Sequence, residues 1–236
     1  MPKLLSCSIV GSLLVALMSV HSTMAQETRR IELNQLPPQG KAVQEFVPAG
    51  WTVETKVDGD LNADQILDTV LMIEAVPPKT NKEAAGERAR ALIVLLKKSS
   101  VQWQRIAIAD RLLLCSICGG TFSSPNGDNI NVRIENGVIL VQQFRGSRNA
   151  IETLHRFWLD KPSNRIVLIG EDVRRFDRAI GDQTFTSSNY LTGVKIVKQY
   201  RGNPQRNELE LVSSKRYRIP KTKLLLESVD IQAISF

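Results

Sequence analysis

"GDLNADQILDTVLMIEAV", residues 59–76, joins an acidic loop to an apolar run, and the apolar part indicates how the chain folds. "TVLMIEAV" (69–76) and the later "ALIVLLKK" (91–98) are almost continuously apolar. A strand with one wet face alternates apolar and polar residues, whereas a strand covered on both faces gives a continuous apolar run. These two segments therefore predict strands that lie between other layers of the protein.

Other segments with the periodicity of strands occupy most of the remaining chain. They are residues 51–57, 101–109, 129–134, 137–144, 150–159, 165–170, 193–200, 208–212 and 223–229. Turn sequences such as "ENG" (135–137), "KPSN" (161–164) and "RGNPQ" (201–205) separate many of them. This pattern predicts an all-β, predominantly antiparallel fold of stacked meander sheets, arranged as a sandwich, a barrel or a propeller-like unit.

The segments outside the strands divide the chain. We expect residues 26–38 to be an extended lead-in, and 39–50 to form one short helix that ends near Pro48 and Gly50. The polar stretch 77–89 is expected to be a surface loop that includes a helical turn. Residues 51–236 are then a single β-rich domain.

The N-terminus has the order of a secretory signal peptide. Lys3 precedes an apolar run over residues 4–20, and the small residues Thr23 and Ala25 precede a cleavage site before Gln26. The alternative is a membrane anchor, but a run of 17 residues is at the lower limit for spanning a bilayer. We therefore expect residues 1–25 to be removed, and the mature chain to be periplasmic or extracellular without a membrane span.

The net charge of the full chain is +7, and most of the basic residues lie in the C-terminal half. They gather in residues 173–178, 200–206 and 214–223. Either these are solvated strand faces, or they attract a polyanion. Export favours an anionic envelope polymer or an envelope protein as the partner and argues against nucleic acid.

The acidic loop carries a candidate metal site. Asp60, Asn62, Asp64 and Asp68 stand at relative positions 1, 3, 5 and 9, and the carbonyl of Ile66 can add a ligand at position 7. Such a set of oxygen ligands suits Ca²⁺. Between positions 57 and 78 the chain has five acidic residues and no Lys or Arg, so a divalent cation would relieve repulsion among the carboxylates. The open alternative is an Asx-rich turn whose side chains bond to their own backbone.

This loop resembles the calcium loops of FG-GAP (integrin-α-type) repeats, which precede a buried strand. The resemblance extends over about a dozen residues and implies calcium ligation by Asp60, Asn62, Asp64 and Asp68. It departs at position 6, where Gln65 replaces the usual glycine and must adopt the backbone of a sharp turn. The acidic residue that EF-hand loops carry at position 12 is also absent.

Cys115 and Cys118 in "LLLCSICGGTF" (112–122) are the cysteines left after removal of the signal peptide. Zinc needs about four ligands, and His155 would be the one remaining histidine. "GGTFSSPNG" follows the pair, whereas a redox-active CxxC opens a helix. We expect a structural disulfide, with a thiol–disulfide exchange pair and a metal site as alternatives.

A second resemblance combines both motifs. A group of uncharacterised secreted bacterial proteins is similar in an early "GDLNxD" and a central "CxxCGGxF", and its C-terminal region is similar to residues 189–197. The matching residues are Gly59, Asp60, Leu61, Asn62, Asp64, Cys115, Cys118, Gly119, Gly120 and Phe122. The resemblance implies export and a shared β fold, and it implies no activity.

We find no persuasive catalytic motif in the sequence. Phosphate-binding glycine loops and a GxSxG elbow are absent, and His155 is expected to be a partly buried, hydrogen-bonded residue on the same strand face as Phe157. Trp51, Trp103 and Trp158 fall in strand patterns and are expected to pack in the protein. The leading hypothesis is a non-catalytic exported β domain that binds a ligand or supports the cell envelope. The alternatives are a carbohydrate-active or other hydrolase that uses the acidic loop, and a thiol–disulfide partner protein.

Overall fold

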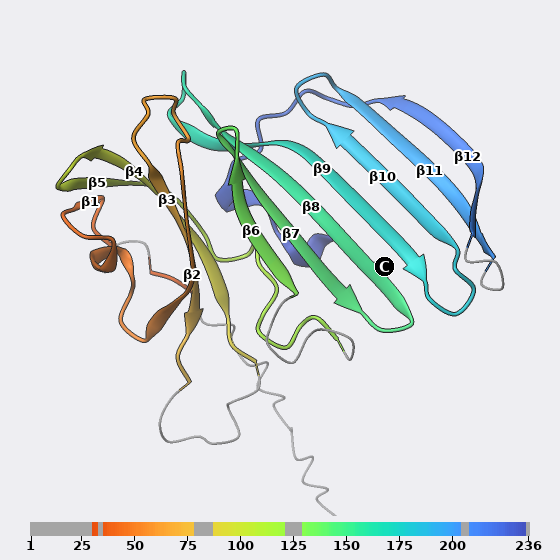
Figure 1. Ribbon diagram of the computed structural model, residues 1–236, viewed down its shortest axis with the longest axis horizontal. Coiled ribbons are helices and arrows are strands. Elements are labelled where there is room, and N and C mark those ends of the chain that lie inside the picture. The colour runs from red at the N-terminus through yellow and green to blue at the C-terminus, as the bar shows by residue number, and fades with distance from the viewer. Residues whose placement is uncertain (1–29, 33–34, 78–86, 121–128, 204–207, 235–236) are drawn as a thin grey trace, which may run out of the picture.

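The computed structural model describes residues 30–32, 35–77, 87–120, 129–203 and 208–234. Two antiparallel meander sheets dominate it (Figure 1). The smaller sheet has the strand order β1-β5-β4-β3-β2, and the larger sheet has the order β12-β11-β10-β9-β8-β7-β6. The all-β, antiparallel prediction is confirmed, and among the expected architectures the two sheets fit a sandwich.

The strands of the smaller sheet are β1 (Gln39–Gly40), β2 (Trp51–Gly59), β3 (Asp68–Ala75), β4 (Arg90–Ser99) and β5 (Gln102–Ala109). Those of the larger sheet are β6 (Ile130–Glu135), β7 (Val138–Gly146), β8 (Asn149–Asp160), β9 (Arg165–Asp177), β10 (Gln183–Asn189), β11 (Val194–Asn203) and β12 (Glu208–Arg218). The described residues also form three short 3₁₀ helices, η2 (Val43–Phe46), η4 (Leu226–Ser228) and η5 (Ile231–Ala233). No helix of the described chain has the length and apolar character needed to cross a membrane.

The main hydrophobic core lies between the two sheets. Val70 and Val94 of the smaller sheet and Val141 and Phe157 of the larger sheet are buried in it. Leu226 in η4 belongs to the same cluster, so the C-terminal segment also contributes to this core. The core is therefore shared by the strands from β2 to β9 and by the C-terminal segment.

A second core covers the other face of the smaller sheet. Leu71 and Ile93 point to this side and pack with Leu36 and Phe46 from the segment that precedes β2. All eight residues of β3 are buried as a result. The prediction that these apolar strands are covered on both faces is confirmed, and the second cover is the N-terminal segment.

Two of the turns expected from the sequence join neighbouring strands. Asn136 and Gly137 have φ values of 51° and 75° in the turn between β6 and β7. Two consecutive left-handed residues give the turn type whose twist matches an antiparallel hairpin. Asn164 has a φ of 51° in the turn between β8 and β9.

Other expectations about local structure are wrong. Residues 223–229 form a short bridge at Leu225 followed by η4, because Leu226 and Val229 are buried at the spacing of a 3₁₀ turn. The sequence reading also missed β10, whose segment 183–189 is mostly polar. The short helix expected within 39–50 is present as the four-residue η2, and β1 occupies Gln39–Gly40 before it.

Candidate functional site

The acidic loop forms a tight turn held by the Asp60 carboxylate. Its Oδ1 accepts a hydrogen bond from the backbone N–H of Ala63 at 2.7 Å, and its Oδ2 accepts one from Gln65 at 2.8 Å. Ala63 and Gln65 both have left-handed backbones, with φ values of 63° and 68°. The hydrogen bond from Gln65 is the main cause of a lowered pKa of Asp60. Gln65 therefore does adopt the conformation that usually requires glycine.

Asn62, Asp64 and Ile66 belong to the same turn. The Asn62 side chain donates to Asp64 Oδ2 at 2.8 Å, and its Oδ1 accepts from the Asp64 backbone at 2.8 Å. The N–H of Ile66 donates to Asp64 Oδ1 at 2.8 Å. These contacts are those of an Asx-rich turn, the alternative left open by the sequence.

Asp68 has a different role from the other loop acids. Its two oxygens accept hydrogen bonds from the backbone N–H groups of Leu61 and Lys97, each at 2.9 Å. Burial raises its pKa. Across the described residues, no group of three or more His, Cys, Asp or Glu side chains with ligand atoms within 4.8 Å of one another includes Asp60, Asp64 or Asp68. Asp68 therefore ties the loop to β4, and calcium binding stays a prediction.

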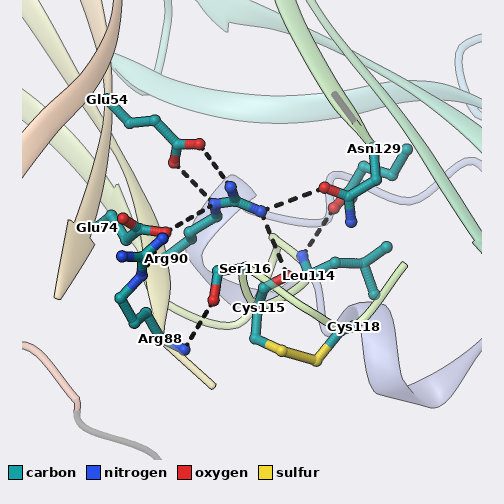
Figure 2. A network of polar contacts seen from close by, with 10 residues as sticks. Glu54, Glu74, Arg88, Arg90, Leu114, Cys115, Ser116, Cys118 and Asn129 are labelled. Atoms are coloured by element: carbon teal, nitrogen blue, oxygen red, sulfur yellow. Dashed lines mark hydrogen bonds and ion pairs between the residues drawn. A yellow bond between two sulfur atoms is a disulfide. The ribbon is translucent and has the colours of Figure 1, made fainter. Parts of the chain in front are cut away.

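Cys115 and Cys118 form a disulfide beside a buried network of charges (Figure 2). The guanidinium of Arg90, at the start of β4, lies at its centre with 2% of its side chain exposed. Arg90 donates to both carboxylate oxygens of Glu54, at 2.5 and 2.7 Å. It also donates to the carbonyl of Cys115 and to Asn129, each at 3.3 Å. One side chain thus joins β2 and β4 to the disulfide loop and to the start of β6.

Glu74 on β3 completes this network. It lies 3.1 Å from Arg88 and 3.7 Å from Arg90. Burial, followed by repulsion from Glu54, raises the pKa of its carboxyl. The network was not predicted from the sequence, although an acidic residue inside the apolar run 69–76 was a usable signal.

The disulfide region contains one cluster with metal-binding atom types. It consists of a carboxylate oxygen of Glu87 and the sulfur atoms of Cys115 and Cys118, which all lie within 4.8 Å of one another. Both sulfur atoms are held in the disulfide, whereas a thiolate is the form of cysteine that ligates metals. The geometry of this region therefore suits a structural cross-link.

His155, which was expected to be partly buried, is fully buried on β8. Its Nε2 lies 3.4 Å from Glu171 Oε2, and its ring stacks on Phe157 with 6.1 Å between centroids. Neither ring nitrogen has a hydrogen-bond partner among the described residues, so the expected hydrogen bonding is not found. No described hydroxyl or thiol is therefore activated by this histidine.

The larger sheet ends in three strands that leave the core, and we call β10–β12 the open wing. Ser188 is the only buried residue within these strands. Their substantial contacts are with neighbouring strands of the same sheet, and in Figure 1 no described helix covers them. Both faces of the wing are therefore accessible to a partner.

The two faces of the open wing differ in charge. Across neighbouring strands, His155 lies opposite Glu171, Glu171 opposite Ser188, and Ser188 opposite Lys195. Lys195 therefore lies on the same face of the larger sheet as the buried His155, and we call this the inner face. By the alternation of strands, this inner face also carries Arg201, Lys215, Glu208 and Glu210. The outer face carries Lys198, Arg216 and Arg218 without an acid from the wing.

A hollow of ≈ 620 Å³ lies on the outer face of the larger sheet. Phe185, Lys198 and Tyr200 from the wing line it, together with Arg174 and Asp172 from β9. Arg174 pairs with Glu152 at 2.6 Å, and Arg156 pairs with Asp172 at 2.7 Å, so the acids around the hollow are neutralised by local partners. Lys198 of the wing also lines the hollow and forms no ion pair with a described residue, so the charge left beside the hollow is positive.

Comparison of this chain with models of protein families, with curated proteins and with solved structures gives no match. The candidate sites are therefore judged by their geometry. On that basis the outer face of the wing combines charge, aromatic rings and a hollow in one place.

The tryptophans differ in exposure. Trp51 is buried and Trp103 is partly buried against the second core, as expected. Trp158 is 37% exposed and lines another hollow, of ≈ 600 Å³, together with Asp60, Asn62 and Asp160. An exposed tryptophan beside acids was not expected from the strand pattern.

Proposed function

We propose that this chain is an exported, non-catalytic binding module of the cell envelope, and that it binds an anionic polymer through the outer face of the open wing. The single observation that carries the proposal is the composition of that face. It has three cations, Lys198, Arg216 and Arg218, no acid from the wing, and the aromatic rings of Phe185 and Tyr200 beside a hollow. Export rests on the N-terminal segment, residues 1–25.

Physical chemistry favours a flexible polyanion for this surface. Cations spread along neighbouring strands produce a positive field that attracts a repeating negative charge, with a strength that salt reduces. The aromatic rings are half-buried, and their accessible part supplies apolar surface beside the cations. A polymer that carries both rings and anionic groups, such as an acidic envelope polysaccharide, matches both features.

The test is calorimetric titration of the protein with lipopolysaccharide, with an acidic polysaccharide and with neutral dextran. We expect binding to the two anionic polymers that weakens as salt increases, and no binding to dextran. The triple variant Lys198→Gln, Arg216→Gln, Arg218→Gln should lose at least about tenfold in affinity.

A matched control comes from the inner face. The triple variant Lys195→Gln, Arg201→Gln, Lys215→Gln removes the same charge, and it should lose less than about threefold in affinity, because local contacts outweigh the screened field of the whole protein. Equal losses in the two variants would reduce the binding to general charge attraction, and no binding at low salt would refute the proposal.

The proposal includes calcium as a stabiliser of the acidic loop. Asp60, Asn62, Asp64 and Ile66 share one turn with the left-handed residues that a cation-binding loop needs. Calcium should raise the melting temperature of the protein, and the Asp64→Asn variant should show a smaller increase. A melting temperature that does not change with calcium would leave the loop as an Asx-rich turn.

A carbohydrate-active enzyme is the second candidate, because Trp158, Asp60 and Asp160 line one hollow. An aromatic platform with two nearby carboxylates is the kind of site in which glycosides are bound and cleaved. Asp160 is buried and pairs with Lys223 at 2.9 Å, so Asp160→Asn should lower the melting temperature as well as abolish release of reducing sugars from envelope polysaccharides. Lys223→Gln breaks the same ion pair and should leave that activity in place. Unchanged activity, or none in the parent protein, would remove this candidate.

A further inference from the structure

We propose that the outer edge of β12 is a self-association site, at which two copies of this chain pair antiparallel and join their larger sheets. β12 is the last strand of the larger sheet, and within the described chain no strand pairs with its other edge. An edge strand presents unpaired backbone N–H and C=O groups, which form a template for another strand.

The edge is long and apolar as well as open. β12 has 11 residues, and ten of them are exposed. Leu209, Leu211, Val212 and Tyr217 are each 46–52% exposed. Exposed apolar side chains on an open edge are the usual mark of a strand that pairs with a partner.

The charges of β12 indicate that the partner is a second copy. The N-terminal half carries Glu208 and Glu210, and the C-terminal half carries Lys215, Arg216 and Arg218. No described residue forms an ion pair with Glu210 or Lys215. Antiparallel pairing of two copies places each acidic half against a basic half. A parallel pairing of two copies would instead place like charges opposite one another.

A β-bulge fixes the register of this pairing. Ser213 lies opposite Gln199 and Leu211 lies opposite Tyr200, so Val212 is an additional residue in β12. The bulge shifts the alternation, and Glu210 and Lys215 then lie on the same face, opposite Arg201 and Val197. Opposed residues of two paired strands must share a face.

Two antiparallel registers centred near the bulge keep opposed residues on one face outside it, and we choose the one that pairs more of the strand, from Glu208 to Tyr217. It is centred between Val212 and Ser213, and it places Glu210 opposite Lys215 of the second copy, twice in the dimer. Leu211 then lies opposite Ser214, and Tyr217 opposite Glu208. The register is closed by a two-fold axis, as isologous interfaces are, so it produces a dimer and does not extend into a filament.

The experiment is sedimentation analysis of the purified protein over a range of concentrations, with charge reversals at the two opposed positions. Glu210→Lys and Lys215→Glu should each raise the dissociation constant of the dimer at least about tenfold, because two attractive pairs become repulsive. An equimolar mixture of the two variants should form a heterodimer with nearly the original affinity, since the lysine introduced into one chain then faces the glutamate introduced into the other.

The control is Lys195→Glu on β11, which makes the same charge change as Lys215→Glu but away from the edge. It should leave the dissociation constant of the dimer unchanged. Thermal melts of each variant establish that it is folded. A monomeric parent protein, a dimer that is insensitive to both reversals, or folded single variants that stay monomeric when mixed would each overturn the inference. Because polymer binding is measured separately, its failure would not affect this result.

Discussion

Arg90 connects several segments of the described chain through one guanidinium. It is buried, and its partners come from β2, from the disulfide loop and from the start of β6. A buried charge is tolerated only when its partners satisfy it, so removal of one member leaves the others unpaired in a poorly solvated site.

Replacement of Arg90 by leucine should lower the free energy of unfolding by about 3–5 kcal/mol, because Glu54 and Glu74 lose their shared cation. Denaturant melts measure this loss. Lys56→Ala removes an exposed pair with Asp58 and should change stability by no more than about 1 kcal/mol. Similar effects of the two substitutions would contradict the role assigned to Arg90.

Asp60 makes the folding stability of the protein depend on pH, and the lowered pKa of its carboxyl gives the direction of this dependence. The backbone N–H of Gln65 lowers the pKa of its carboxyl in the folded chain, so the folded chain holds the proton less tightly than the unfolded chain. The resulting stability is present above the unfolded pKa, at neutral pH, and is lost as pH falls through the folded pKa. The difference in melting temperature between the parent protein and Asp60→Asn should therefore shrink on acidification, and a constant difference would contradict this assignment.

The strands show where sequence patterns suffice and where they fail. β3 and β4 were predicted because a strand buried on both faces gives an apolar run that few other structures produce. β10 was missed, and the second halves of β9 and β12 were indicated only as charged stretches compatible with solvated strand faces, because these segments belong to the exposed part of the sheet, where polar and charged residues are tolerated. The paired cysteines were predictable from spacing, whereas the Arg90 network depends on contacts between distant segments.

The disulfide closes a very short loop and should contribute modestly to stability. Its removal by the double variant Cys115→Ser, Cys118→Ser should lower the free energy of unfolding by about 2 kcal/mol in the chain-entropy model. Reduction of the parent protein should give a similar loss, and the double variant should not respond to reductant. Complete unfolding on reduction would show that the loop supports much more of the fold, including the Arg90 network.

As a whole, the protein has two parts with unequal burial. The smaller sheet is covered on both faces by the second core and by the larger sheet. The strands of the open wing contain one buried residue, and their substantial contacts are all with strands of the same sheet. The candidate site lies in the less buried part, which the sequence indicated only through its basic stretches at 173–178, 200–206 and 214–223.

This division predicts the order of local opening. Backbone amides of β3 and β4 should exchange with solvent most slowly, near the rate of global unfolding, and those of β12 should exchange fastest among the strands. Hydrogen exchange followed by mass spectrometry measures both. If β12 were protected at high protein concentration and exposed on dilution, that would also agree with the proposed pairing of its edge, whereas equal protection of β3 and β12 at every concentration would contradict the division.

The central claim is that the outer face of the open wing binds an anionic polymer. The most direct measurement is an NMR titration of the ¹⁵N-labelled protein with short fragments of an acidic polysaccharide. We expect the largest amide shifts around Lys198, Tyr200 and Arg216, with little change around Asp60 and Trp158. Shifts concentrated at the acidic loop, or none at saturating polymer, would contradict the claim.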